Sequence, residues 1–204
     1  MGGSSIDRAT SEGRPQAASP PIRDALPADA AAIAAIGTVG FSRIHEPLMG
    51  VVPTRAAVEQ SYSHDAVVDS ITRCAGADDA HFLVTERDGR VVGFLHYDCF
   101  TSEPELHRIY LDDEEIGRGT GSALMDELHA RLGEQASYVL LVVLANEPAR
   151  QFYARHGLVE ERRLPDGRVF YRGSMDLDLP PGGEPVPAVV LRRMVGASHP
   201  STAD

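Results

Sequence analysis

The chain has 204 residues, a formal net charge of −11 and 43% hydrophobic residues, which is typical of one globular domain. It contains no unbroken apolar run of membrane-spanning length. Its N-terminus also lacks the basic residues followed by an apolar stretch that are typical of a secretion signal. All 19 basic residues are arginine, and the acidic balance argues against a nucleic-acid partner, whose phosphates need a basic surface. Because the chain has only two cysteines, we expect a cytoplasmic protein.

Composition changes at both ends of the chain. Residues 1–20 and 196–204 are rich in small and polar residues and contain few large apolar side chains. Such segments cannot bury enough surface to offset the entropy lost on ordering. We therefore expect two disordered tails around a single domain over residues 21–195.

The first half of the domain begins with a short predicted strand, Ile22–Ala25. A helix is predicted over Ala28–Ile36, and Gly37 is expected to end it. Residues 40–54 show no periodicity and are predicted to form a loop. The weakly amphipathic segment Ala56–Cys74 is predicted to form one further helix.

A β-hairpin and a third strand follow. His81–Glu86 and Val91–Tyr97 have strand-like composition and are joined by the turn residues Asp88 and Gly89. Glu105–Leu111 is predicted to be the next strand. Alternation along it predicts that four residues share one face: Glu105, His107, Ile109 and Leu111.

The second half alternates helix and strand. Thr120–Leu132 is amphipathic, Tyr138–Ala145 is an unbroken apolar run typical of a buried strand, and Glu147–His156 is a helix that ends at Gly157. Leu158–Leu164 is a further strand. The succession of strand, helix and parallel strand implies a right-handed crossover, so the sequence predicts an α/β fold with a mixed sheet.

Two segments compete for the closing strand, Met175–Leu179 and Val189–Val195. If the later one closes the sheet, residues 165–187 form an insertion. In that case Asp166 and Gly167 form a turn. The aromatic pair that follows, Phe170 and Tyr171, is expected to cover the molecule on which the protein acts or to pair two subunits.

A glycine-rich turn, Ile116–Gly121, lies between a predicted strand and the predicted helix that begins at Thr120. Its glycines let backbone N–H groups converge, and the helix N-terminus adds partial positive charge, which together favour a phosphate or pyrophosphate. The turn has neither the Gly-Lys-Ser/Thr of a Walker A loop nor the dinucleotide-binding glycine spacing. The preceding acidic run, residues 112–115, is expected to face solvent.

A second motif follows the predicted buried strand: Asn146, Ala149, Phe152, Tyr153, Gly157 and Leu158. Together with the ten-residue spacing from Leu111 to Gly121, it makes the chain resemble the GCN5-related N-acetyltransferase (GNAT) superfamily over about Ile22–Val195. The resemblance implies a single-domain GNAT fold, with a strongly twisted mixed sheet of about seven strands, flanked by helices and splayed between the fourth and fifth strands. It favours Val189–Val195 as the closing strand, which makes residues 165–187 a hairpin-like insertion.

The resemblance also implies acetyl-CoA as co-substrate and no metal. The backbones of Ile109 and Leu111 would pair with pantetheine, and Gly117–Ser122 would cradle the pyrophosphate. The implied cofactor-binding residues are Ile109, Leu111, Ile116, Gly117, Arg118, Gly119, Thr120, Gly121, Ser122, Asn146, Ala149 and Phe152. Ile116 stands where the family usually has Arg or Gln, and Arg118 could supply the missing charge.

Acyl transfer to an amine needs a proton acceptor for the amine and a proton donor for the departing thiolate. Tyr153 matches the position where many family members place the general acid, and the small Ala149 beside it leaves room for the thioester. Glu105 and His107 are the candidate general base, because family members often have Glu or His at these two positions.

The acceptor site is expected to come from the predicted loop and second helix, with His45, Glu46, Tyr62 and Asp65 as candidate residues. The implied function is direct transfer of an acetyl group from acetyl-CoA to the primary amine of a small molecule. A peptide or protein N-terminal acetyltransferase and a non-catalytic acyl-CoA-binding sensor are the alternatives. No nucleic-acid or membrane partner is expected, and a homodimer is a possible assembly.

Overall fold

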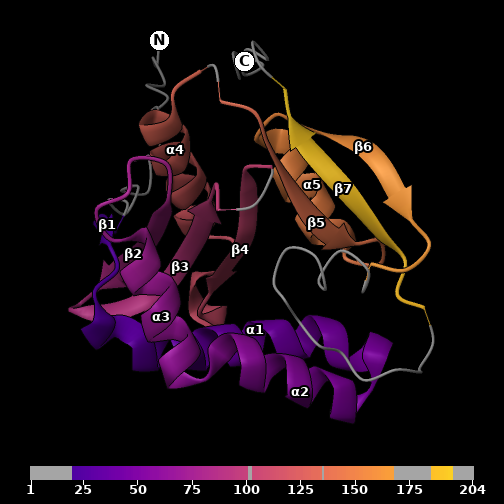
Figure 1. Ribbon diagram of the computed structural model, residues 1–204, viewed down its shortest axis with the longest axis horizontal. Helices are drawn as coiled ribbons and strands as arrows, with labels where there is room; N and C mark the ends of the chain where they lie inside the picture. Colours follow the sequence, from indigo (N-terminus) through magenta and orange to yellow (C-terminus); the bar gives the residue numbers. More distant parts are fainter. Residues whose placement is uncertain (1–19, 101–102, 135, 168–184, 195–204) are drawn as a thin grey trace, which may run out of the picture.

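The computed structural model describes residues 20–100, 103–134, 136–167 and 185–194 (Figure 1). Nearly all of the two expected tails and most of the expected insertion, including the candidate strand Met175–Leu179, lie outside the described residues. Within the described part of the chain, no helix has the length and apolar character that crossing a membrane requires.

The described residues form a seven-stranded mixed sheet in the order β1-β2-β3-β4-β5-β7-β6. Its strands are β1 Ile22–Asp24, β2 His81–Arg87, β3 Arg90–Asp98, β4 Glu105–Leu111, β5 Tyr138–Val143, β6 Leu158–Leu164 and β7 Ala188–Arg193. All neighbouring strands in it are antiparallel except β4 and β5, which are parallel. The predicted mixed α/β sheet is confirmed, and β7 occupies the later of the two candidate closing segments.

Helices cover both faces of the sheet (Figure 1). They are η1 Pro27–Asp29, α1 Ala30–Met49, α2 Val51–Tyr62, α3 His64–Cys74, η2 Asp113–Glu115, α4 Thr120–Leu132 and α5 Glu147–Arg155, where η denotes a short 3-10 helix. Helices α1 to α3 pack on one face around a cluster that contains Ile33, Ile71 and Phe94. Helices α4 and α5 pack on the other face around a second cluster that contains Leu124 and Tyr138.

The sheet opens between β4 and β5. Their pairing is limited to Glu105 opposite Val139, next to a backbone hydrogen bond of 3.0 Å from the Val139 N–H to the Pro104 carbonyl. Beyond this pair the two strands diverge toward their carboxyl ends, as Figure 1 shows. The predicted splay between the fourth and fifth strands is therefore confirmed.

Helix α1 corrects the predicted loop over residues 40–54, because the helix continues through Gly37 and Gly40. These two glycines allow close packing and do not end the helix. A Cβ atom at Gly37 would lie 2.3 Å from the ring of Tyr62, and a Cβ atom at Gly40 would lie 2.3 Å from the ring of Tyr110. Tertiary packing thus overrides the low helix propensity of glycine here.

The predicted single helix Ala56–Cys74 is two helices, α2 and α3. The break is at Ser63, whose backbone is extended and whose side chain accepts a hydrogen bond of 3.4 Å from the Ala66 N–H. A serine oxygen that satisfies a free N–H group starts a new helix and turns the chain direction there. The apolar pattern continues across Ser63, which is why periodicity alone did not show the break.

Strand β4 contains a β-bulge. Tyr97 of β3 lies opposite Leu106, whereas its neighbour His96 lies opposite Arg108, so His107 has no partner of its own on β3. An extra residue of this kind shifts the alternation of all residues on one side of it.

The bulge makes the predicted common face of β4 wrong. Ile109 and Leu111 pack against the cluster beneath α4. His107 instead lies on the α1–α3 side of the sheet, with its ring centroid 4.8 Å from that of His96, and Glu105 lies beside His107. The two pairs of side chains are therefore presented to opposite sides of the strand.

Candidate active site

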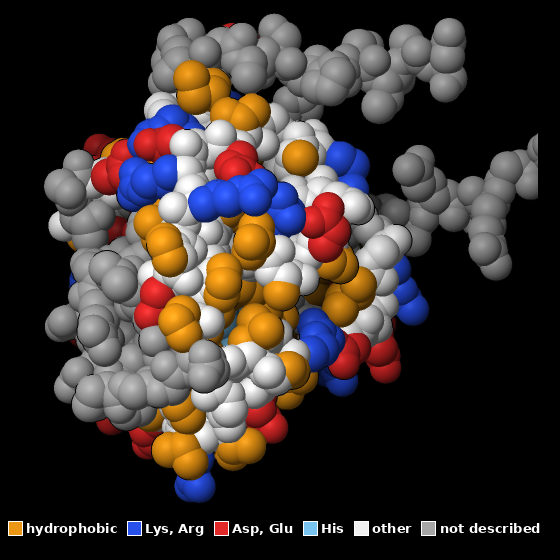
Figure 2. All heavy atoms as spheres, turned by 90° about the vertical axis from the view of Figure 1, so that its right-hand side faces the viewer, with side chains coloured by type: hydrophobic (Ala, Val, Ile, Leu, Met, Phe, Trp, Pro, Cys, Tyr) orange, Lys and Arg blue, Asp and Glu red, His pale blue; other side chains and the backbone are white. Residues whose placement is uncertain are grey.

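A cavity of about 630 Å³ occupies the opening between β4 and β5. Its walls come from β4, β5, α1, α5 and the glycine-rich turn before α4. Figure 2 shows hydrophobic side chains gathered around a hollow on the side of the molecule that carries β6 and β7. Most of the predicted site residues line this cavity: His45, Tyr62, Glu105, His107, Ile109, Leu111, Ile116, Gly117, Gly119, Gly121, Ser122, Asn146, Ala149, Phe152 and Tyr153.

Four predicted site residues are not among those that line the cavity. Glu46 is exposed on α1, and the side chain of Asp65 on α3 is fully exposed. The side chain of Arg118 is 58% exposed. Thr120 is buried, and its hydroxyl donates a hydrogen bond of 2.6 Å to Glu115.

The glycine-rich turn has the backbone that a phosphate cradle needs. Gly117 and Gly119 have φ angles of +80° and +84°, which favour glycine, and a Cβ atom at either position would meet nothing within 4 Å. Gly119 is the N-cap of α4, so the free N–H groups and partial positive charge of that helix begin at the cavity wall. The space beside the turn and its donors therefore fit a pyrophosphate group.

Glu115 corrects the expectation that the whole acidic run faces solvent. Its side chain is only 2% exposed. It accepts hydrogen bonds from Arg87 Nε at 2.6 Å and from Arg87 Nη2 at 2.9 Å, in addition to the one from Thr120. The guanidinium of Arg87 lowers the pKa of Glu115 to about 2. Glu115 therefore ties the glycine-rich turn to the β2–β3 hairpin.

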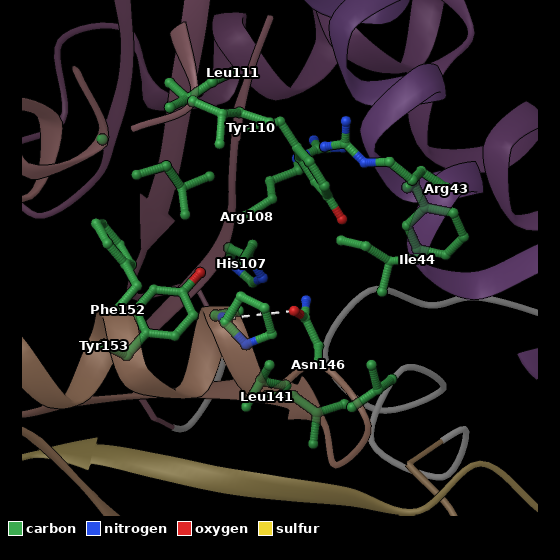
Figure 3. A pocket seen from close by; sticks show the side chains of 18 of the residues that line it. Arg43, Ile44, His107, Arg108, Tyr110, Leu111, Leu141, Asn146, Phe152 and Tyr153 are labelled. Atoms are coloured by element: carbon green, nitrogen blue, oxygen red, sulfur yellow. Dashed lines mark hydrogen bonds between the residues drawn. The ribbon is translucent and has the colours of Figure 1, made fainter. Parts of the chain in front are cut away.

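Helix α5 supplies the opposite wall of the cavity. Asn146 is its N-cap, and its side-chain oxygen accepts a hydrogen bond of 3.3 Å from the Ala149 N–H. Figure 3 shows the hydroxyl of Tyr153 pointing into the cavity from this helix, with Phe152 beside it. Burial raises the pKa of Tyr153, so the hydroxyl keeps its proton at neutral pH and can donate it.

Glu105 and His107 lie together on the β4 wall of the cavity. Glu105 is 4% exposed and the His107 side chain 5% exposed. Nδ1 of His107 lies 3.5 Å from Oε1 of Glu105, and Nε2 lies 3.0 Å from Oδ1 of Asp98. Burial alone would lower the pKa of His107, but its contacts with the Asp98 and Glu105 carboxylates outweigh burial and raise the pKa to about 9.

The cavity is also lined by residues that the sequence analysis missed, among them Phe41, Arg43 and Ile44 of α1 and Arg108 and Tyr110 of β4. Figure 3 shows Arg43 and Ile44 across the cavity from Tyr153. His45, which was predicted, stacks on Phe41 with the ring centroids 3.9 Å apart. The spacing of Phe41, Ile44 and His45 fits one face of a helix, and this signal was hidden by the expected loop.

The sequence comparisons agree with this geometry. Residues 78–160 match the family described as an acetyltransferase (GNAT) domain. An uncharacterized N-acetyltransferase of Methanocaldococcus jannaschii is 32% identical over 93 residues, which cover 41% of this chain and 41% of that protein. The chain thus spans about two fifths of the length of this curated relative.

Solved structures share the fold along most of the chain. The PaiA N-acetyltransferase of Thermoplasma acidophilum, in complex with coenzyme A, is 18% identical, covers 86% of this chain and 98% of its own, and has a TM-score of 0.68. Ard1 of Thermoplasma volcanium is 22% identical, covers 86% of this chain and 97% of its own, and has a TM-score of 0.60. Residues 78–160 therefore match the GNAT acetyltransferase domain family, and the chain as a whole has the fold of these solved N-acetyltransferase structures.

Proposed function

We propose that the protein is an acetyl-CoA-dependent N-acetyltransferase that acts on the primary amine of a small molecule. The observation that supports this most is the cavity at the splay of the sheet, where the glycine-rich turn, Glu105 and Tyr153 line one space. A phosphate cradle, a carboxylate and a buried phenol are the groups that acyl transfer from a coenzyme A thioester to an amine requires.

Cofactor binding depends mainly on the backbone. The turn over residues 116–122 would hold the pyrophosphate through N–H groups at the start of α4. The pantetheine arm would lie along the unpaired edge of β4 beside Ile109 and Leu111, with Asn146 and Ala149 on the other side. Because backbone donors bind the pyrophosphate, Ile116 is compatible with cofactor binding although it carries no charge.

Acetyl-CoA, when bound, supplies the acetyl group as a thioester. Glu105 accepts a proton from the acceptor ammonium, directly or through one water molecule, so that the amine nitrogen can bond to the acetyl carbonyl carbon. As the carbon–sulfur bond breaks, Tyr153 donates its hydroxyl proton to the departing sulfur. The second proton that the amine nitrogen loses as the amide forms returns to Tyr153, and Glu105 releases the first one to solvent. The products are then the acetylated amine and free coenzyme A.

His107 supports Glu105 in this scheme. At neutral pH an imidazole with a pKa of about 9 already carries its proton, so it cannot accept a second one from the amine. Glu105 is therefore the member of the pair that takes up the proton. His107 holds the Glu105 carboxylate in place through the contact between its Nδ1 and Oε1 of Glu105.

The cavity lining favours a monoamine with an apolar body. Phe41, Ile44 and Tyr62 form an apolar and aromatic surface at the acceptor end. Glu105 is the one acid among the described residues that line the cavity. One carboxylate neutralises one ammonium group, and a polyamine would leave its second charge without a partner. The net charge of −11 attracts cationic amines to the protein as a whole.

A panel assay tests the proposal. Purified protein is incubated with acetyl-CoA and pools of small amines, peptides with free N-termini and polyamines, and products are identified by mass spectrometry while free thiol is measured. We expect acetylation of one or more small monoamines. Turnover of peptides alone would instead indicate a peptide or protein N-terminal acetyltransferase. Tight acetyl-CoA binding without acetylation of any amine would indicate a non-catalytic acyl-CoA sensor.

A further inference from the structure

Two strands bring together a cluster of three side chains with metal-binding atoms, His96 and Asp98 of β3 and His107 of β4. The cluster lies on the α1–α3 side of the sheet. His96 is 7% exposed, Asp98 is 4% exposed, and the side chain of His107 is 5% exposed. One nitrogen or oxygen atom from each residue lies within 4.8 Å of those from the other two. The distance from Asp98 Oδ2 to His96 Nε2 is 3.2 Å, and that from Asp98 Oδ1 to His107 Nε2 is 3.0 Å.

These atoms are close, but they do not form hydrogen bonds of acceptable geometry. Both ring nitrogens of His96 and Nε2 of His107 are buried without a hydrogen-bond partner. A buried polar atom without a partner is costly, and native proteins rarely leave several of them in one place. Nitrogen and oxygen atoms that converge without hydrogen bonding each other are the arrangement that a cation shared between them produces.

We propose that His96, Asp98 and His107 bind a divalent transition-metal ion of the zinc class. Two imidazole nitrogens and one carboxylate form a known ligand set for Zn²⁺ and for Fe²⁺, and they do not suit Mg²⁺ or Ca²⁺, which prefer oxygen atoms. Three protein ligands leave a coordination position open for water or a substrate atom.

The surroundings of the cluster fit a metal site. A metal-bound histidine usually donates its second ring N–H to a carboxylate, and Nδ1 of His107 lies 3.5 Å from Oε1 of Glu105. The ring of His96 stacks on Phe82 with the centroids 4.8 Å apart, which fixes its orientation. The charged groups around the cluster are the Asp98 and Glu105 carboxylates, the Arg108 guanidinium and the protonated His107 ring, and a bound ion would take the place of the His107 proton.

The β-bulge creates the site. Without the extra residue in β4, the side chains of His107 and His96 would not both lie on the α1–α3 side. His107 also lines the cavity, whereas His96 and Asp98 do not. The ion would therefore bind behind the β4 wall. Binding through Nε2 displaces the proton that His107 carries in the metal-free protein, so the ion then supplies the positive charge behind Glu105.

Metal content tests the proposal without any activity assay. The full chain is incubated with Zn²⁺, separated from free metal by gel filtration and analysed by plasma mass spectrometry, and a parallel sample is loaded with Co²⁺ for visible spectroscopy. We expect about one metal ion per chain and the d–d absorption bands of Co²⁺ bound by nitrogen and oxygen ligands. His96→Gln and Asp98→Asn should each lower the affinity for Zn²⁺ by about 10-fold or more.

The matched control is His81→Gln, which makes the same change on the neighbouring strand β2, outside the cluster. It should keep the full metal content. A wild-type protein that retains no Zn²⁺ and gives no Co²⁺ bands would overturn the proposal even if the variants fail to fold. Equal metal retention in wild type and in folded His96→Gln would also overturn it. Neither result depends on acetyl transfer, so the proposed function is tested separately.

Discussion

The two walls of the cavity offer different kinds of contact to a bound molecule. On the α4 side, the backbone wall consists of the glycine-rich turn, which offers backbone N–H groups and a helix N-terminus to a ligand. On the α1–α3 side, the side-chain wall consists of side chains such as Phe41, Tyr62 and Glu105, which are brought together by helices α1 and α2 and the bulged strand β4. A backbone site needs glycines at fixed spacing, whereas a side-chain site has no fixed sequence pattern. The cofactor part is therefore predictable from sequence, and the acceptor part is not.

One of the two largest effects is expected from Gly119→Glu, which tests whether the glycine-rich turn binds the pyrophosphate. The substitution places a carboxylate beside the turn and strains a residue with a φ angle of +84°. We expect the affinity for acetyl-CoA to fall by about 100-fold or more, as measured by calorimetry. The control Gly133→Glu has a φ angle of +75° and equally open surroundings at the other end of α4, and it should bind acetyl-CoA like wild type. Equal affinities in the two variants would contradict the proposal that the glycine-rich turn binds the pyrophosphate of acetyl-CoA.

Glu105→Gln tests the side-chain wall. Removing the proton acceptor should lower kcat by about 10²–10⁴-fold, while the affinity for acetyl-CoA stays near that of wild type. Steady-state kinetics and calorimetry on the same preparation give both values. The control Glu127→Gln changes an acid on α4 that bonds to Arg131 away from the cavity, and it should leave kcat unchanged. An unchanged kcat in Glu105→Gln would show that another group accepts the proton of the amine.

Tyr153→Phe tests the group on α5 that faces both walls. The hydroxyl is needed as the thiolate leaves, so kcat should fall by about 10-fold or more without a change in acetyl-CoA affinity. Tyr97→Phe removes another hydroxyl, which contacts Cys99 Sγ at 3.2 Å and belongs to a residue that does not line the cavity, and it serves as the control. If both variants keep wild-type kcat, the thiolate leaves without a proton from Tyr153.

Gly40→Ala tests whether the side-chain wall depends on the close packing of α1 against Tyr110. The added Cβ atom would lie 2.3 Å from the Tyr110 ring, so helix α1 or the ring must move. We expect a loss of about 1–3 kcal/mol in the free energy of unfolding, measured by denaturant titration. Val39→Ala, at a neighbouring exposed position of the same helix, should change it by much less. A stabilised Gly40→Ala variant would mean that helix propensity outweighs packing here.

The smallest effect is expected from Glu115→Gln, which loosens the turn of the backbone wall. Because the folded protein holds the pKa of Glu115 at about 2, below its ordinary value near 4.5, ionised Glu115 stabilises the fold above about pH 4.5. This stabilisation is lost as the pH falls toward 2. The difference in Tm between wild type and Glu115→Gln should therefore shrink over that range. Glu114→Gln, at an exposed neighbour, should show no such trend.

The sequence analysis succeeded where local signals agreed with tertiary structure. Thr120–Leu132 was predicted with the bounds that α4 has, because its apolar stripe, its preceding glycines and the following Gly133 all point the same way. It failed in α1, where Gly37 and Gly40 are dictated by the aromatic rings of residues distant in sequence. Asp98 was missed because its relation to His107 exists only through strand pairing.

The bulge in β4 also restricts how this wall can change. Deletion of His107 would leave Leu106 and Arg108 adjacent with the orientations that they already have, so the strand would pair regularly and lose only the His107 side chain. Straightening the bulge without a deletion would instead shift the pairing on one side of it by one residue and turn Leu106 and Glu105 to the opposite sides of the sheet. A carboxylate would then face the hydrophobic cluster beneath α4, and a leucine would face the α1–α3 side. Related sequences that keep both Glu105 and His107 on this wall should therefore keep the bulge.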